Sequence, residues 1–289
     1  MRFISFSQAG KNGVAVLDSN GSATGSLEGD ADYPGDLDAV VARGAAALRE
    51  AGVVLAKARP IDLSAISYRP VLVATSSKLI CVGLNYKDHS AESGYELPTY
   101  PSLFARFPSS LIAHGAPLVR PPESTHFDYE GELVAVIGKG GRRITKERAL
   151  DHVVAYSIFN DGSLRDFQHR TPQWTVGKNF DGTGAFGPTL VTADELPAGA
   201  VGLRLQTRLN GRTVQDASTS DLVFDVATLV SLISEVMTLN AGDVIVTGTP
   251  AGVGVARKPP LFMKAGDVCE VEIEGLGVLR NPVADEVAR

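Results

Sequence analysis

The chain has 289 residues, with 27 Lys or Arg against 33 Asp or Glu, for a formal net charge of −6. Its composition, 44% apolar and 21% charged, is that of a globular protein and excludes a long disordered chain. No apolar run reaches the roughly 18 residues of a spanning helix, and no basic stripe is present to bind nucleic acid. Two cysteines in apolar surroundings suit free thiols in a reducing compartment, so we expect a cytoplasmic protein.

The first 75 residues predict a small N-terminal α+β module. Two strand-length runs are punctuated by the turn sequences Lys11-Asn12-Gly13 and Ser19-Asn20-Gly21. A helix is expected from about Asp36 to Glu50, and Gly52 is expected to end it.

From Leu79 onward, short β-type runs are separated by Gly, Pro, Asn or Asp. Residues 203–217 alternate on both sides of Asn210-Gly211, which predicts a hairpin. A second helix is expected from about Asp225 to Leu239, with its first residue as the cap. Strands this short and numerous favour an α+β, mainly β fold over a parallel βαβ sheet, with a β-roll or sandwich over residues 76–289.

The acidic segment 127–138 is the sharpest local feature. Read as one strand, it puts Asp128, Glu130 and Glu132 on one face and then enters the core. Buried carboxylates are costly unless they are paired or bind a cation, and oxygen ligands suit Mg²⁺, Mn²⁺ or Ca²⁺. An edge strand with its acids facing solvent explains the same pattern, so the spacing leaves both interpretations open.

Further acidic and polar groups follow this segment. An apolar run that ends in Asp161 predicts a strand whose end supplies another acid, although Asn-Asp-Gly is equally an ordinary turn. The capping-box spacing from Ser163 predicts a helix whose first turns carry Arg165, Gln168 and His169. A plain surface helix is the alternative interpretation.

Three other segments carry groups that suit catalysis. On a helix, His89 and Glu92 would share a face, and a carboxylate beside an imidazole is the usual arrangement of a general base. Lys178 lies among apolar residues and is either a substrate-binding cation or a side chain that reaches the surface. The Gly- and Thr-rich segment 243–252 offers hydroxyl and N–H donors to an anion. The alternative interpretation of His89 and Glu92 is a solvated pair, and the alternative for segment 243–252 is a plain turn.

Taken in this order, the segments resemble the fumarylacetoacetate hydrolase family. The resemblance runs from about Leu79 to the end of the chain and is specific, because several motifs agree in order and spacing. The residues that carry it are Cys81 to Tyr86 with His89 and Glu92, Asp128 to Leu133, Asp161, Arg165 to Gln168, Lys178, and Thr247 to Gly254.

The resemblance implies that residues 76–289 form a mixed β-roll catalytic domain, usually dimeric, that holds Mg²⁺ or Mn²⁺ on three carboxylates. The implied metal ligands are Glu130, Glu132 and Asp161, with Asp128 supporting them. The implied catalytic residues are a water-activating dyad of His89 and Glu92, and Lys178 near the substrate carbonyl. The implied substrate contacts are Tyr86, Arg165, Gln168 and Thr249. We also expect Tyr95, Arg106 and Phe107 to shape the far end of the pocket.

The predicted function is a Mg²⁺- or Mn²⁺-dependent hydrolase that cleaves a C–C bond in an acylpyruvate or similar 2,4-dioxo acid. The metal would serve as a Lewis acid, so that cleavage leaves an enolate. The same residues serve a 2-oxo-diacid decarboxylase, hydratase or isomerase of aromatic catabolism, of the 2-hydroxyhepta-2,4-diene-1,7-dioate type, which is the alternative. A non-catalytic, metal-stabilised binding module fits less well, because His89 and Glu92 supply a base.

Overall fold

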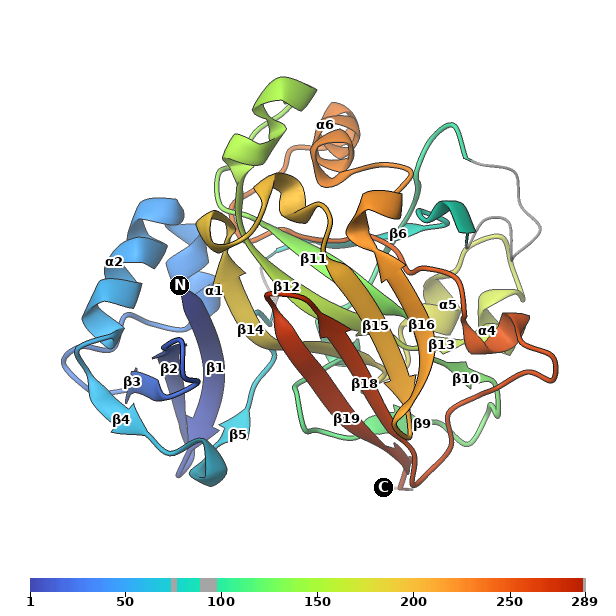
Figure 1. The fold of residues 1–289 in the computed structure, drawn as a ribbon, viewed down its shortest axis with the longest axis horizontal. Coiled ribbons are helices and arrows are strands. Elements are labelled where there is room, and N and C mark those ends of the chain that lie inside the picture. Colours follow the sequence, from blue (N-terminus) through green and yellow to red (C-terminus); the bar gives the residue numbers. More distant parts are fainter. Residues whose placement is uncertain (74–76, 89–97, 288–289) are drawn as a thin grey trace.

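The structure is a computed structural model that describes residues 1–73, 77–88 and 98–287. Within these residues, twelve strands form one large mixed sheet and five form a second sheet (Figure 1). Side chains of both sheets share one buried cluster, which includes Leu133 and Ile158 from the large sheet and Leu205 and Val271 from the second. The expected α+β, mainly β fold class is confirmed.

The large sheet carries strands from both ends of the chain. Its strands are β1 (Arg2–Gln8), β2 (Lys11–Leu17), β3 (Ala23–Leu27), β4 (Arg59–Ile61), β5 (Ser67–Tyr68), β6 (Leu79–Gly83), β7 (Ser102–Ala105), β8 (Leu111–Ile112), β11 (Gly131–Ile137), β12 (Val153–Asp161), β14 (Gly184–Thr192) and β17 (Val244–Val246). The order is β4-β3-β2-β1-β14-β12-β11-β17-β6-β7, with β5 paired to β1 and β8 to β14. This order puts β11 and β12 in the middle of the sheet.

The second sheet has the order β16-β15-β18-β19-β9. Its strands are β9 (Leu118–Arg120), β15 (Arg204–Leu209), β16 (Arg212–Ser218), β18 (Val268–Ile273) and β19 (Gly277–Asp285). A separate two-stranded ladder joins β10 (Phe127–Asp128) to β13 (Ser163–Leu164). The predicted hairpin turns at Asn210-Gly211 as expected, because both residues have the positive φ of a tight turn, 53° and 78°.

The predicted N-terminal module shares its sheet with the predicted catalytic domain. β1 pairs with β14 in antiparallel register, with Arg2 opposite Val191. The helices α1 (Leu37–Ala42) and α2 (Ala45–Leu55) lie beside these first strands (Figure 1). A domain boundary near residue 75 stays a prediction, but the two parts are joined in one sheet by the short pairing of β1 with β14.

Two local predictions in the first part are wrong. The first hairpin turns at Ala9-Gly10 rather than at 11–13, so Lys11 already pairs with Gln8. The helix expected over 36–50 is two helices, because Gly44 interrupts it with a φ of 88°.

The second helix also continues past its expected end. Gly52 lies inside α2 rather than after it. A Cβ at this position would overlap the sulfur of Met1 and contact the ring of Phe3. Gly52 is therefore a close-packing position between the helix and the first strand, and not a helix stop.

The acidic segment is two strands rather than one. β10 ends at Asp128 and β11 begins at Gly131, so Glu130 lies in the connection between them. β10 belongs to the small ladder and β11 to the large sheet. The expected alternation of Asp128, Glu130 and Glu132 on one face of a strand is therefore wrong.

The helices near this segment are short. α4 (Arg165–Gln168) and α5 (Thr175–Lys178) each have four residues. The expected capping box at Ser163 is absent, because the Ser163 hydroxyl donates to the carbonyl of Asp161 at 2.7 Å. The hydroxyl is used to close the turn after β12 instead of capping the helix.

The longer helix α6 (Val226–Val236) is capped as predicted. The Asp225 carboxylate accepts from the Thr228 N–H at 2.7 Å. The helix ends at Val236, three residues before the expected end at Leu239. None of the helices in the described ranges is long and apolar enough to cross a bilayer.

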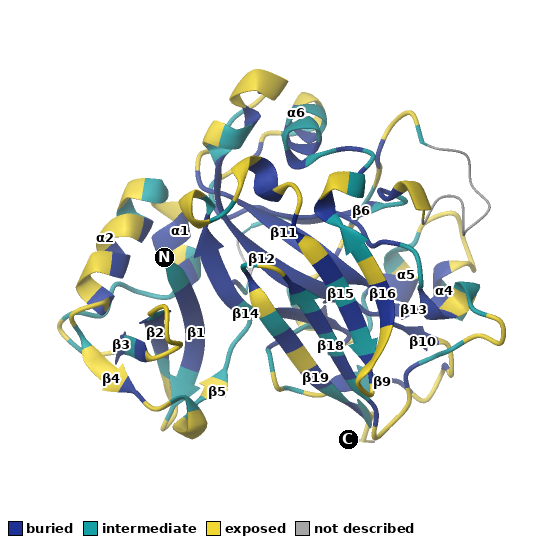
Figure 2. Ribbon diagram, viewed as in Figure 1, coloured by how far each residue is buried: buried dark blue, intermediate teal, exposed yellow. Residues whose placement is uncertain are grey.

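The middle of the large sheet is completely covered. Every residue of β11 and β12 is buried (Figure 2). Cys81 and Cys269 are buried free thiols, as expected. Acids at the ends of β11 and β12 therefore lie inside the protein, where each charge needs a partner.

Candidate metal centre

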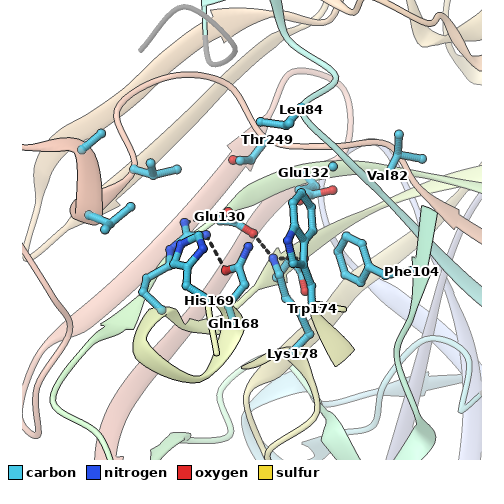
Figure 3. Close-up of a pocket in the computed structure, with 16 residues that line it drawn as sticks. Val82, Leu84, Phe104, Glu130, Glu132, Gln168, His169, Trp174, Lys178 and Thr249 are labelled. Carbon is cyan, nitrogen blue, oxygen red and sulfur yellow. Dashed lines mark hydrogen bonds and ion pairs between the residues drawn. The ribbon is translucent and has the colours of Figure 1, made fainter. Parts of the chain in front are cut away.

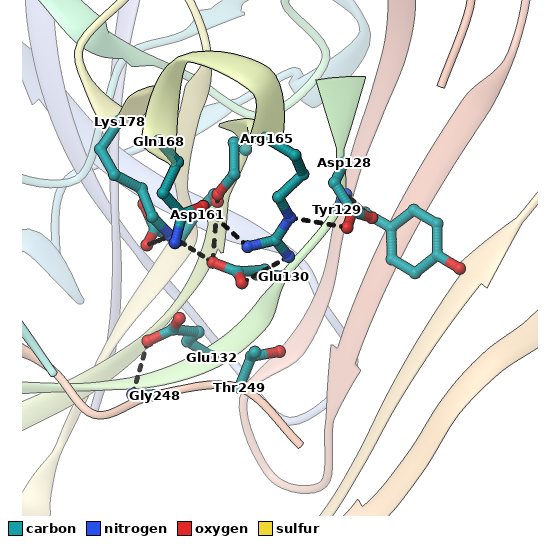
Figure 4. A network of polar contacts seen from close by, with 12 residues as sticks. Asp128, Tyr129, Glu130, Glu132, Asp161, Arg165, Gln168, Lys178, Gly248 and Thr249 are labelled. Carbon is teal, nitrogen blue, oxygen red and sulfur yellow. Dashed lines mark hydrogen bonds and ion pairs between the residues drawn. The ribbon is translucent and has the colours of Figure 1, made fainter. Parts of the chain in front are cut away.

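Three buried carboxylates converge where β11 begins and β12 ends (Figure 4). Glu130 precedes β11, Glu132 is its second residue, and Asp161 is the last residue of β12. The Asp161 N–H donates to the Glu130 carbonyl at 2.8 Å, which ties the two strand ends together. The three acids offer one carboxylate oxygen each within 4.8 Å of one another.

Two buried cations face the Glu130 side of this cluster. Lys178 donates to Glu130 and, at 2.7 Å, to Asp161. Arg165 donates to Glu130 at 2.7 Å and to Asp128 at 2.8 Å. Burial disfavours both charges, but the neighbouring carboxylates outweigh it and raise the pKa of Lys178 and of Arg165. Both side chains therefore stay charged and fixed.

Asp161 is held from behind by a third cation, Arg106. This fully buried guanidinium donates to Asp161, to the Gly162 carbonyl at 3.2 Å and to the Thr183 hydroxyl at 2.7 Å. Arg106 was expected to shape the substrate pocket, but it does not line the cavity. Phe107 is 51% exposed and does not line it either. The structure therefore puts neither residue in the lining of the cavity that the three acids face.

Glu132 is the exception among the three acids. Its carboxylate accepts from the Gly248 N–H at 2.5 Å and makes no ion pair with any described residue. Burial, followed by the charges of Asp161 and Glu130, raises the pKa of Glu132 well above its ordinary value. The Gly- and Thr-rich segment thus gives one of its N–H donors to a protein carboxylate.

Asp128 supports Arg165 instead of joining the cluster. It is fully buried and accepts from the N–H groups of Gly254 and Val255 at 2.7 and 3.0 Å. It also accepts from the Tyr129 N–H at 2.9 Å and forms the ion pair with Arg165. Asp128 therefore links the loop at 252–256 to the arginine that faces the acids.

The acids and cations face a cavity of about 300 Å³ (Figure 3). Glu130, Glu132, Asp161, Arg165 and Lys178 supply its charged surface. Its apolar lining consists of Val82, Leu84, Phe104, Trp174, Val253, Val255 and Ala256. These apolar residues were not predicted as site residues, because they come from separate segments and form no motif.

Of the other predicted site residues, Gln168 and Thr249 line the cavity and Tyr86 does not. Gln168 lines the cavity and accepts from Arg165 at 2.9 Å. Thr249 lines it too, and its hydroxyl donates to the Gly131 carbonyl at 3.0 Å. Tyr86 is buried but is not part of the lining; burial and then the charge of Glu132 raise the pKa of its phenol.

The predicted dyad of His89 and Glu92, and also Tyr95, lie outside the described residues. Arg106, which we expected at the far end of the pocket, pairs with Asp161. The sequence signal for this pairing was a single arginine in the apolar run Leu-Phe-Ala-Arg-Phe, which indicates a buried charge that needs an acidic partner.

The donor set fits a divalent cation. Carboxylate oxygens are the ligands that Mg²⁺ and Mn²⁺ prefer. The acids Asp128, Glu130, Glu132 and Asp161 face the cations Arg106, Arg165 and Lys178, which leaves one formal negative charge. Of these four acids, Glu132 is the one that makes no ion pair within residues 1–73, 77–88 and 98–287, and it lies beside Glu130 and Asp161. A cation held by Glu130, Glu132 and Asp161 would balance it.

Comparison with known proteins agrees with this geometry. Residues 78–284 match the family model described as fumarylacetoacetate (FAA) hydrolase C-terminal. "Oxaloacetate tautomerase fahd2, mitochondrial" of Xenopus laevis is 45% identical over 213 residues, which are 73% of this chain and 66% of that protein. "Oxaloacetate tautomerase YisK" of Bacillus subtilis is 41% identical over 225 residues, 77% of this chain and 74% of that protein.

A solved structure is similar over almost the whole length. The fumarylacetoacetate hydrolase of Exiguobacterium antarcticum superposes with a TM-score of 0.87 at 37% identity, covering 99% of this chain and 100% of that one. The matched family segment contains the three acids, both lining cations and Arg106. The chain therefore belongs to the fumarylacetoacetate hydrolase family of enzymes.

Proposed function

We propose that this chain is a divalent-metal-dependent enzyme that interconverts the keto and enol forms of a short 2-oxo diacid such as oxaloacetate. The observation that carries the proposal is the set of three buried carboxylates facing a cavity beside two fixed cations. Two relatives at 45% and 41% identity are named oxaloacetate tautomerases, which supports the choice of reaction.

The metal and the protein contribute different parts. A divalent cation on Glu130, Glu132 and Asp161 would act as a Lewis acid on a 2-oxo acid and make its C3–H bond more acidic. It would also change the formal charge of the cluster from −1 to +1, which favours a dianionic substrate.

The chain's own residues orient the substrate. Arg165 and Lys178 are held in place by ion pairs, so their remaining N–H donors are fixed toward the cavity. Fixed donors bind a carboxylate or carbonyl oxygen without further loss of side-chain freedom. The rings of Phe104 and Trp174, which pack against each other in the lining, form an apolar wall that reduces the access of water to the cavity.

The size of the cavity suits a small substrate. A volume of about 300 Å³ is at the lower end of the range of ligand sites. A four-carbon diacid fits this volume together with ordered water, which supports a substrate of the oxaloacetate class.

C–C bond hydrolysis of an acylpyruvate, the function predicted from the sequence, is the second candidate. The similarity to the Exiguobacterium hydrolase favours it. It needs an activated water, for which the sequence offers His89 and Glu92. Tautomerisation needs proton transfer but no water attack, so His89→Ala should abolish hydrolysis and spare tautomerisation.

The test is an assay of the purified protein on enol oxaloacetate, followed by the loss of enol absorbance with Mg²⁺, Mn²⁺ or excess EDTA. Acceleration that depends on the metal, and its loss in Glu130→Gln, is the expected result. Activity that survives EDTA, or activity only on acylpyruvates, would overturn the proposal. The implied homodimer also stays a prediction, which sedimentation of the full chain would check.

A further inference from the structure

His169 is a titratable group at the cavity that the predicted chemistry does not use. It directly follows α4 and lines the cavity together with Arg165, Gln168 and Lys178 (Figure 3). The residue is exposed, so one side of its ring meets water. Within the described ranges, the ring makes no hydrogen bond, and it is therefore available to a bound molecule.

The surroundings of His169 keep its imidazole neutral. Partial burial, then the positive charges of Arg165 and Lys178, lower its pKa, and the carboxylate of Glu130 offsets only part of this effect. Arg165 is the first residue of α4, Lys178 is the last residue of α5, and Glu130 lies in the connection before β11. A neutral imidazole at neutral pH has a free lone pair and can accept a proton.

The other nitrogen groups of the lining cannot accept one. Arg165 and Lys178 carry raised pKa values and are tied to carboxylates. The amide of Gln168 is not basic, and Trp174 is a donor only. Among the described lining residues, His169 is therefore the side chain that combines a basic nitrogen with access to both cavity and solvent.

We propose that His169 is the catalytic base that moves the C3 proton of the 2-oxo diacid, an inference that rests on the proposed tautomerase function. In the keto-to-enol direction, the imidazole takes a proton from C3. The C–H electron pair becomes the C2=C3 bond, and the carbonyl pair moves to the C2 oxygen, which takes a proton from water. The imidazolium then releases its proton to solvent, and the reverse direction uses the same steps backwards.

The test compares His169→Gln with wild type at saturating Mg²⁺. We expect kcat to fall by about 10²-fold, the usual contribution of a general base. We expect KM and the Mn²⁺ affinity measured by calorimetry to change less than twofold. The acid limb of the pH–rate profile, where protonation of the base slows the wild type, should disappear. In D₂O, NMR should show slower deuterium incorporation at C3.

The control is His126→Gln, because His126 packs against Phe262 and does not line the cavity. It should keep wild-type kcat and the acid limb. His169→Asn provides a second variant at the exposed site and should behave as His169→Gln does.

The outcomes separate the two proposals. Wild type that is inactive on oxaloacetate overturns the tautomerase function itself. Active wild type with an unchanged kcat or a retained acid limb in both His169 variants overturns the role of His169 alone. A loss in His169→Gln that is confined to KM would make His169 a binding residue and also overturn its role as base.

Discussion

The two sides of the acid cluster are balanced in different ways. Asp161 is held between two cations, Arg106 behind it and Lys178 in front. Glu132 has only the Gly248 N–H and makes no ion pair with a described residue. One side is therefore assembled by the protein itself, while the other carries a charge that an added cation would balance. This difference predicts which substitutions disturb the fold and which disturb metal binding.

The largest expected effect is that of Glu130→Gln, because Glu130 lies between the two sides and contacts both Arg165 and Lys178. The loss of a ligand should remove several kcal/mol of transition-state stabilisation, or about 10³-fold in turnover. Mg²⁺ binding by calorimetry should disappear with it. Normal binding together with lost turnover would instead separate Glu130 from the metal.

Arg106→Met tests the side that the protein assembles. Removing one partner of a buried ion pair should lower the free energy of unfolding by about 3–5 kcal/mol, measured by urea unfolding in EDTA. Arg106→Lys should recover part of the lost free energy of unfolding, because lysine restores the positive charge but not the several fixed N–H donors of the guanidinium. If Arg106→Met unfolds like the wild type, Asp161 does not depend on Arg106.

Glu132→Gln should stabilise the metal-free protein, whereas Arg106→Met should destabilise it. In EDTA the variant should be more stable than the wild type at pH 7, because the amide carries no charge, whereas burial raises the pKa of the Glu132 carboxyl and disfavours its charged form. With Mg²⁺, its thermal shift should be smaller than that of the wild type. A variant that is less stable in EDTA would show that Glu132 is already balanced.

Glu132 also makes the stability of the metal-free protein depend on pH. The pKa of Glu132 is raised in the folded state. Above the ordinary pKa near 4.5, the unfolded chain has therefore lost the Glu132 proton while the native protein still holds it. The metal-free protein should therefore lose stability as the pH rises from about 4.5 toward the raised pKa. Thermal melts across this range should show that loss in wild type and not in Glu132→Gln.

Gly83→Ala carries the smallest expected effect and concerns the apolar wall. A Cβ at Gly83 would overlap the ring of Trp174. This ring packs edge-on against the ring of Phe104, with 5.6 Å between the two ring centroids. The displaced ring should raise KM by roughly threefold, less than about 1 kcal/mol, and leave unfolding in EDTA nearly unchanged. A KM equal to that of wild type would place the substrate away from Trp174.

The fold class was predictable because strand length, turn residues and helix caps are local signals. The hairpin at Asn210-Gly211 and the cap at Asp225 show this directly. The close packing at Gly52 was not predictable, because it depends on Met1 and Phe3, about 50 residues earlier in the sequence. The break at Gly44 is a local glycine signal that the helix prediction passed over.

The acid cluster was predictable in part. Spacing alone grouped Asp128 with Glu130 and Glu132, and the break before β11 separates them. The family resemblance selected Glu130, Glu132 and Asp161 instead, which the structure brings together. Arg106 could not be paired with Asp161 from the sequence, because 55 residues separate the two.

The pairing of β1 with β14 has a consequence for self-association. β14 lies directly beside β12, and Gly184 of β14 stands opposite Asp161. A chain shortened by its first three strands would leave part of β14 as an open edge, and an open edge recruits strands from other molecules. The pairing with β1 therefore covers this part of β14, and we expect its removal to promote aggregation.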